Sequence, residues 1–469
     1  KMNLDGDFTV TVSNGTTTAA QLAKIDAKTS KNVDASAVTA ISGSASELTT
    51  IAAAQGTGDN QYTLKGDVAL TLTDTGTVDS GDLETIRGMS TGFTDAATVA
   101  TINGTASEIT TLLGNEGTNG NTVGLDGNFA MTVSSGTATV DQANTMAAFS
   151  TSGAITATIS NTDIAELDDL TTGSADQLTI TVASTSATAA QLTTVAGATG
   201  LNVTATAVES VTGSVSEITT LLGVEGSSGD KVNLDTNYFV TITDTGSVAA
   251  SDLSTINAAT SGLVTATSVA TLTGTAAAIN TLVGNEGDSG DKVNLDSDYV
   301  ATLSDTTITA TVLNAVNGNV PGTVNASTVA TITGAAADIN TAYESSGISG
   351  LANEAVAITD TSVSAADLNT LDGNTTGAID ASTLKTLTGT GAAAQIAFNS
   401  AGINLTFNAS DYLAGYADLL GAFGTDTTAA SSHYFANGVS EGRSFDAFDE
   451  TSYLASHADL LAAFGTDTT

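Results

Sequence analysis

The chain has 469 residues, which is enough for several domains or for one long array of repeats. Its 50 acidic residues outnumber 10 basic ones and give a formal net charge of −40, which argues against nucleic acid and against an anionic membrane surface as partners. We therefore expect cations as partners, although the same acidity also suits a surface adapted to saline surroundings.

A nine-residue pattern recurs along the chain and marks a repeat. It reads LDGDFTVTV at 4–12, LKGDVALTL at 64–72, LDGNFAMTV at 125–133, LDTNYFVTI at 234–242 and LDSDYVATL at 295–303. The spacings are 60, 61, 109 and 61 residues, and the wide gap holds an irregular insertion near 153–200. A shorter last copy starts at 354, so about six copies of a ~60-residue repeat cover 1–405.

One copy, taken at residues 68–114, shows what each repeat should contain. Thr- and Val-rich residues 68–74 predict a strand, and DTG at 74–76 predicts a turn. Three short segments then carry helix signals, each with a polar first residue and a glycine near its end. These predicted helices are 79–88, 94–104 and 105–114.

Acidic residues recur at the start of the helical pattern and need not be catalytic. Thr105 and Glu108 fit a capping box, in which each side chain bonds a backbone N–H of the other residue. Ser44 with Glu47, and Ser214 with Glu217, have the same spacing, whereas the copy at 275–284 has alanine in place of the acid. A reaction would not tolerate that loss, so these acids predict a structural role.

Each repeat is too small to bury its own apolar face, because two-turn helices are unstable alone. Stacking of neighbouring repeats solves this problem, and we expect a β-rich, solenoid-like α/β array with short helices. Tandem small β-sandwich domains are the alternative fold.

The loops between copies are acidic and rich in glycine, a composition that suits calcium. The candidate ligands are Asp288, Asp291, Asp296 and Asp298 in one loop, and Asp230 and Asp235 in an equivalent loop. Solvated turns built from Asp and Gly explain the same sequence without a metal. Four aspartates that follow strands, Asp74, Asp244, Asp305 and Asp360, fit local turns closed by their own side chains.

The sequence changes character near 406. Residues 407–428 and 448–469 are two copies of one motif, and the stretch 411–423 predicts an amphipathic helix. We expect a helical tail module at 406–469, with one full 41-residue copy and one truncated copy, in a piece of a longer protein. Arg443 is expected to pair with Glu441 or with a carboxylate of a neighbouring segment.

The stretches 355–389 and 412–444 resemble long repeat proteins on the surfaces of marine cyanobacteria and proteobacteria. GDSGDKV at 287–293 is similar to the glycine–aspartate repeat of secreted calcium-binding β-rolls, although no tandem copies follow. The resemblance implies type I secretion, an extracellular location and calcium, and implies no catalytic residues. TASEITTLLG at 105–114 also looks like short repeats of phage tail fibres.

These observations predict a structural subunit of an extracellular surface assembly, a surface layer or a filament, stabilised by calcium. Copies of the chain itself are the expected partners, and cell-surface glycans or neighbouring cells are further candidates; nucleic acid and membrane insertion are not expected. The alternatives are the stalk of a large secreted adhesin and a phage tail-fibre-like protein. An enzyme is not expected, because the acids are spread over the copies and do not gather in one.

Overall fold

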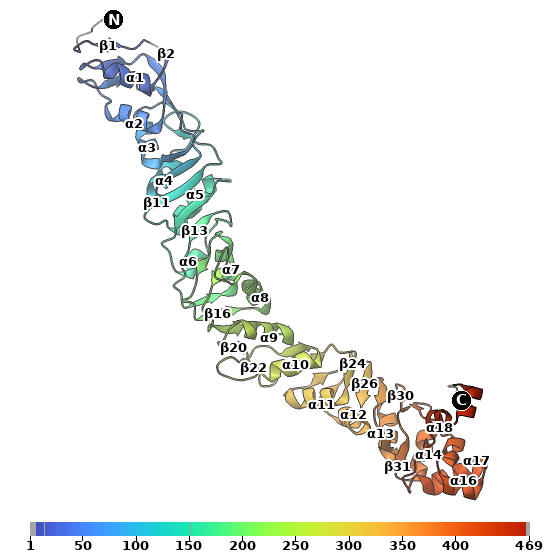
Figure 1. Ribbon diagram of the computed structural model, residues 1–469. Helices are drawn as coiled ribbons and strands as arrows, with labels where there is room; N and C mark the ends of the chain where they lie inside the picture. The colour runs from blue at the N-terminus through green and yellow to red at the C-terminus, as the bar shows by residue number, and fades with distance from the viewer. Residues whose placement is uncertain (1–5, 14, 151, 466–469) are drawn as a thin grey trace. The chain divides into compact units, whose positions relative to one another are not determined.

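The computed structural model describes residues 6–13, 15–150 and 152–465. In these residues short helices alternate with parallel strands in an α/β array, and no sheet closes into a barrel. The chain divides into two compact units, 1–241 and 242–469 (Figure 1). Every printed strand pairing is parallel, unlike the antiparallel sheets of a β-sandwich.

Unit 1 contains eight short helices among its described residues, each between two strands or strand-like segments. The helices are α1 (Ala19–Asp26), α2 (Ala45–Ala53), α3 (Ser80–Gly88), α4 (Ala106–Gly114), α5 (Val140–Phe149), α6 (Ile164–Leu167), α7 (Ala189–Gly197) and α8 (Val215–Val224). The strands are β1 (Val10–Thr11), β2 (Gly15–Thr18), β3 (Val33–Ala35), β4 (Val38–Gly43), β5 (Tyr62–Leu64), β6 (Ala69–Leu72), β7 (Thr77–Asp79), β8 (Thr94–Asp95), β9 (Thr101–Thr105), β10 (Val123–Gly124), β11 (Ala130–Ser135), β12 (Ile155–Thr158), β13 (Gln177–Thr179), β14 (Ser186–Thr188), β15 (Val203–Thr204), β16 (Ser210–Gly213) and β17 (Val232–Asn233), with β18 (Phe239–Ile242) at the boundary.

Unit 2 continues the same alternation and ends in helices. Its strands are β19 (Ser247–Ala249), β20 (Val264–Ala266), β21 (Thr271–Gly274), β22 (Val293–Leu295), β23 (Val300–Leu303), β24 (Thr307–Thr309), β25 (Val324–Asn325), β26 (Thr331–Gly334), β27 (Ile348–Ser349), β28 (Ala355–Ile358), β29 (Ser362–Ser364), β30 (Ile379–Asp380), β31 (Thr386–Thr388) and β32 (Ile403–Asn404). Its helices are α9 (Ala250–Ala259), α10 (Ala276–Val283), α11 (Ala310–Asn319), α12 (Ala336–Glu344), α13 (Ala365–Asn374) and α14 (Gly391–Asn399), followed by α15 (Ala409–Ala414), α16 (Ala417–Phe423), α17 (Thr427–His433), the π-helical turn η1 (Tyr434–Gly438), α18 (Glu450–Ser456) and α19 (Ala458–Phe464).

Strand pairing divides each repeat into two half-repeats, each a strand–helix–strand passage. Thr77 pairs with Thr101, 24 residues on, and Thr101 pairs with Ala130, 29 residues on. A short half-repeat therefore alternates with one that is five residues longer. The extra residues lie in the loop that follows the helix, and a connecting step such as 73–76 completes the ~60-residue period. Later half-repeats are all short, since Thr331 pairs with Ala355 at a separation of 24.

The helices begin where the sequence predicts capping boxes. In α4 the Thr105 hydroxyl accepts from the Glu108 N–H at 3.2 Å, and the Glu108 carboxylate accepts from the Thr105 N–H at 2.9 Å. The predicted boxes at α2 and α8 are also present. At α10 Thr275 caps the helix without an acid, which supports the structural role of these acids.

The prediction of a helix over 94–104 is wrong. Residues of this stretch form β8 and β9, so the copy has two helices rather than three. The Asp95 carboxylate accepts from the Ala97 N–H at 3.1 Å and turns the chain between the strands. The β-branched residues that follow alternate between buried and half-buried positions, which is the period of a strand.

The core of each unit lies between the helices and the parallel strands. In unit 1, α2, α3, α4 and α5 pack in succession (Figure 1). Each helix buries residues three or four apart, such as Leu83 with Ile86 and Ile109 with Leu112. The strands add Ile102 from below each helix. Every half-repeat thus completes its core with side chains of its neighbours.

Three strand-end aspartates bind the preceding half-repeat, and the prediction that they close turns of their own is wrong. The carboxylates of Asp74, Asp305 and Asp360 accept from the first N–H groups of α2, α10 and α12. The oxygen–nitrogen distances are 2.7, 2.8 and 2.8 Å. Free N–H groups and the helix dipole favour a carboxylate at this position.

A glycine before the first strand of many half-repeats lets two backbones approach closely. A Cβ atom would lie 2.5 Å from the carbonyl oxygen of Val68 at Gly92, and 2.1 Å from that of Glu354 at Gly377. Gly153 and Gly322 stand in the same situation. No side chain fits at these positions.

The tail is helical, but the single helix predicted at 411–423 is broken. Helices α15 and α16 are separated at Gly415 and Tyr416, and Tyr416 has an extended backbone. Gly415 lies so close to Ala447 that a Cβ atom would come within 2.5 Å of its side chain. Aromatic rings join the tail to α14, which packs against η1. These rings belong to Phe398, Phe407, Tyr412, Tyr434, Phe435 and Phe445.

Candidate functional site

The acidic loop between α10 and β22 is held by its own backbone. Gly287 N–H donates to the carbonyl of Val293 at 3.0 Å, and Val293 N–H donates to that of Asn285 at 3.1 Å. Gly290 has a φ of 67°, a left-handed conformation that glycine adopts without strain. The equivalent loops after α4 and α8 close in the same way, with Gly120 and Gly229 in the left-handed region.

The predicted ligands of this loop do not converge on one point. Asp288, Asp291 and Asp298 are exposed, and Asp296 is half-buried. Asp291 accepts a hydrogen bond from the Asn257 side chain of α9 at 3.3 Å. The loop therefore presents its carboxylates outward, toward solvent.

The equivalent loop after α8 includes a lysine as well as acids. Asp230 is exposed, and the Asp235 carboxylate accepts from the N–H of Thr236 at 2.7 Å. The Lys231 ammonium donates to the carbonyl of Gly223 at 2.7 Å. One backbone oxygen that could face a cation is thus already occupied by a positive charge.

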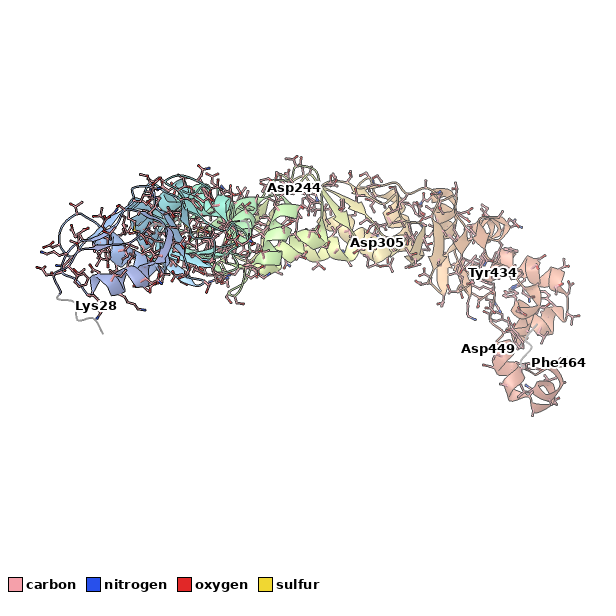
Figure 2. The ribbon with its side chains drawn as sticks, turned by 90° about the horizontal axis from the view of Figure 1, so that it is seen from above. Lys28, Asp244, Asp305, Tyr434, Asp449 and Phe464 are labelled. Atoms are coloured by element: carbon pink, nitrogen blue, oxygen red, sulfur yellow. The ribbon has the colours of Figure 1, made fainter. Side chains whose placement is uncertain are left out.

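Across the described ranges, no group of three or more His, Cys, Asp or Glu side chains is arranged to hold a metal ion. Oxygen-bearing side chains are spread along both units (Figure 2). The six aspartates therefore offer single carboxylates and no ready-made cage, whereas calcium takes six to eight oxygen ligands. Calcium binding stays a prediction.

Beneath two of the loops lie carboxylate–phenol pairs that the sequence analysis missed. The Tyr238 hydroxyl donates to the Glu225 carboxylate at 3.2 Å, and burial raises the pKa of both groups. Burial likewise raises the pKa of Tyr299, with the Glu286 charge adding to the effect. The tyrosine that ends the LDTNY and LDSDY landmarks was the available signal.

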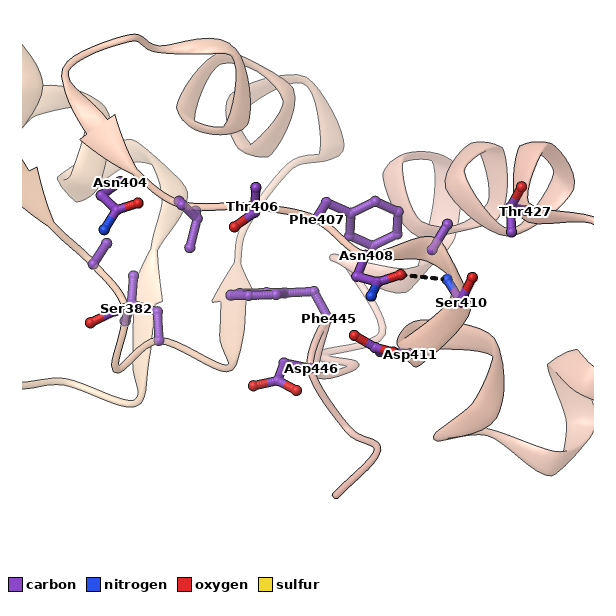
Figure 3. A pocket seen from close by; sticks show the side chains of 14 residues that line it. Ser382, Asn404, Thr406, Phe407, Asn408, Ser410, Asp411, Thr427, Phe445 and Asp446 are labelled. Atoms are coloured by element: carbon purple, nitrogen blue, oxygen red, sulfur yellow. Dashed lines mark hydrogen bonds between the residues drawn. The ribbon is translucent and has the colours of Figure 1, made fainter. Parts of the chain in front are cut away.

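A cavity of about 730 Å³ lies between the last strands and the first tail helix (Figure 3). Phe407 and Phe445 supply apolar surface, and Asn408 and Asp411 supply polar groups. The Asn408 side chain accepts from the Ser410 N–H at 3.0 Å and so caps α15. Its amide oxygen is therefore already engaged.

Asp411 is the most perturbed acid beside this cavity. Burial raises its pKa, and the charges of Glu450 and Asp446 raise it further. Lys385 offsets part of this negative charge, since its ammonium lies 3.2 Å from Asp446. The group can attract a cation, but it provides neither a nucleophile nor a base with a partner for covalent chemistry.

The remaining candidates make structural contacts. His433 Nδ1 lies 3.0 Å from the Tyr412 hydroxyl, and His457 Nδ1 lies 2.9 Å from the Ser456 hydroxyl. Arg443 pairs with Asp418 at 2.8 Å and also with Glu441, as the sequence predicts.

No protein-family model, curated protein or solved structure matches this chain. In the part of the chain that the structure describes, no helix has the length and apolar character needed to cross a membrane. Composition, repetition and geometry are therefore the observations that bear on function.

Proposed function

We propose that this chain is a structural subunit of an extracellular surface assembly, a surface layer or a filament, built as an α/β solenoid. The observation that carries the proposal is the repeated linkage between half-repeats. The same strand register, the same helix packing and the same aspartate-to-helix bond recur in both units. A chain that repeats its contacts in this way is suited to bearing load rather than to chemistry at one place.

Calcium is part of the proposal. The acidic loops carry Asp230, Asp235, Asp288, Asp291, Asp296 and Asp298 at or near the surface, where a second chain can reach them. A cation between two such loops would draw oxygen ligands from both chains, which would supply the number that one loop lacks. Copies of the chain are then the partners, and a net charge of −40 makes their association depend on cations.

We propose a non-catalytic role because the perturbed groups serve structure. The acids with lowered pKa values include Glu108 and Glu217, which cap helices. The half-buried Glu225 is hydrogen-bonded to a tyrosine that lies in the core. An extracellular location belongs to the same proposal and rests on the resemblance described above.

The alternative is the stalk of a large secreted adhesin, or a fibre similar to phage tail fibres. The same repetition favours it, with a ligand-binding part that the described residues do not identify. Glycans or neighbouring cells would then be the partners. This alternative predicts no self-assembly.

Electron microscopy of the purified protein, with calcium and then with excess chelator, separates the two. Ordered sheets or filaments that come apart on chelation support the assembly and a bridging role for the loop acids. Single particles under both conditions would contradict self-assembly and favour the stalk.

A further inference from the structure

The tail motif occurs twice, and the two copies are unequally covered. Phe407, Tyr412, Leu419 and Phe423 of the first copy correspond to Phe448, Tyr453, Leu460 and Phe464 of the second, 41 residues on. Helices α15 and α16 thus correspond to α18 and α19. Two helix pairs with matching apolar residues should need matching cover.

In the first copy the cover is residues 427–445, which include α17 and η1. His433 lies 3.0 Å from the Tyr412 hydroxyl, and its ring centroid is 5.7 Å from that of Phe423. The ring centroids of Tyr434 and Tyr412 are 5.1 Å apart. As a result Tyr412 is 0% exposed.

In the second copy the same face is open. Helices α18 and α19 bury none of their side chains, and Tyr453 is 45% and Phe464 62% exposed. Leu461 is 42% exposed, but its counterpart Leu420 is 47% exposed even in the covered copy. The segment therefore covers the tyrosine and phenylalanine positions and leaves this leucine position in solvent.

Charge points to the same kind of occupant. Arg443 of the covering segment bonds Asp418 of α16 at 3.1 and 2.8 Å, and its guanidinium lies 4.8 Å from the centre of the Tyr416 ring. Asp459 corresponds to Asp418 and is exposed. His457 stands at the Tyr416 position and offers a ring for stacking.

We propose that α18 and α19 form an acceptor for a polypeptide segment with the chemistry of residues 427–445. Such a segment carries a histidine–tyrosine pair that covers Tyr453 and Phe464, and an arginine that reaches Asp459. Each 41-residue motif is then a helix pair followed by a covering segment, and the open pair takes a segment of this kind from another polypeptide. The inference stands independently of the function proposed above.

Binding of a synthetic peptide with the sequence of residues 427–445 to the 469-residue protein tests this proposal. Fluorescence anisotropy of the labelled peptide is expected to give saturable binding. The Phe464→Asp variant should bind about tenfold more weakly, because a charge then replaces the central apolar contact. A peptide with Arg443→Ala should also bind more weakly.

Leu461→Asp is the matched control, since this position is exposed in both copies, and its affinity should equal that of the parent protein. These variants leave the rest of the chain folded because α18 and α19 bury no side chain. Absence of saturable binding would overturn the proposal. So would equal weakening by Leu461→Asp and Phe464→Asp, or dimers in sedimentation that Phe464→Asp abolishes, which would make a second copy's helix pair the occupant.

Discussion

The carboxylate of Asp74 lies 2.7 Å from the backbone nitrogen of Ala45, which is 29 residues earlier and begins helix α2. This single bond joins one half-repeat to the helix of the preceding one. Asp305 and Asp360 repeat it in unit 2. The bond combines a helix cap with a link between repeats, so its loss should affect both.

Replacing Asp74 with alanine should lower the free energy of unfolding by about 1 kcal/mol, the usual effect of removing a helix cap. Asp74→Asn should have a smaller effect, because the amide oxygen still accepts the bond but the charge is lost. Chemical denaturation followed by circular dichroism measures both. Asp169→Ala is the control, since its carboxylate is exposed and has no printed bond. An equal loss in the control would show that the Asp74 bond contributes nothing.

The capping acid Glu108 should make stability depend on pH. Its pKa is lowered, chiefly by the hydrogen bond from the Thr105 backbone, below the ordinary value of 4.5. A lowered folded-state pKa contributes stability above 4.5, and this contribution disappears as the pH falls through the folded value. Carboxyl carbon NMR should therefore give a Glu108 titration midpoint below 4.5.

Glu108→Gln provides the comparison, because Gln keeps the bond, as in the box formed by Gln191 of α7, but does not titrate. Its melting temperature should fall less than that of the parent protein between neutral and acidic pH. Identical pH profiles would contradict a stabilising charge at this cap.

Gly377→Ala should strongly destabilise unit 2. The new methyl group would lie 2.1 Å from the carbonyl oxygen of Glu354, and the backbone must move to admit it. We expect a loss of about 1–3 kcal/mol, the range for overpacking. Gly373→Ala is the matched control in α13, where no atom lies within 4 Å, and alanine should stabilise the helix slightly. Denaturant midpoints that shift equally for both variants would contradict the close approach.

Calcium should raise the melting temperature if the loop acids bind it, because a ligand that binds only the folded state stabilises that state. The shift should disappear with chelator and should shrink when Asp288 and Asp291 are both changed to Asn. Asp169→Asn, outside these loops, should leave the shift unchanged. If the parent protein melts identically with and without calcium, the calcium proposal is wrong.

The repeat, its helix starts and the helical tail could be predicted because their signals are local. A threonine three residues before a glutamate predicts a capping box wherever the helix packs, and Thr105 with Glu108 forms one. Residues 94–104 misled because a polar start and a final glycine fit a short helix, while the alternation that gives β9 depends on pairing with β7 and β11.

Other features depend on residues far along the chain. No property of Asp74 alone indicates that the N–H of Ala45 lies opposite, since that depends on the stacking of half-repeats. The break between α15 and α16 depends on Ala447, which approaches Gly415 from more than thirty residues away. The direction of the loop carboxylates likewise follows from the backbone bonds that close each loop.

The alternation of 24- and 29-residue half-repeats means that this protein has already accommodated insertions. Five extra residues after α4 leave the parallel register of Thr101 with Ala130 intact, because the loop closes on itself before the next strand begins. These loops are therefore natural points for grafting foreign sequence. A peptide epitope or a binding tag inserted at Gly120 or Gly229 would be displayed at the surface, at intervals set by the repeat, while the strands keep their partners.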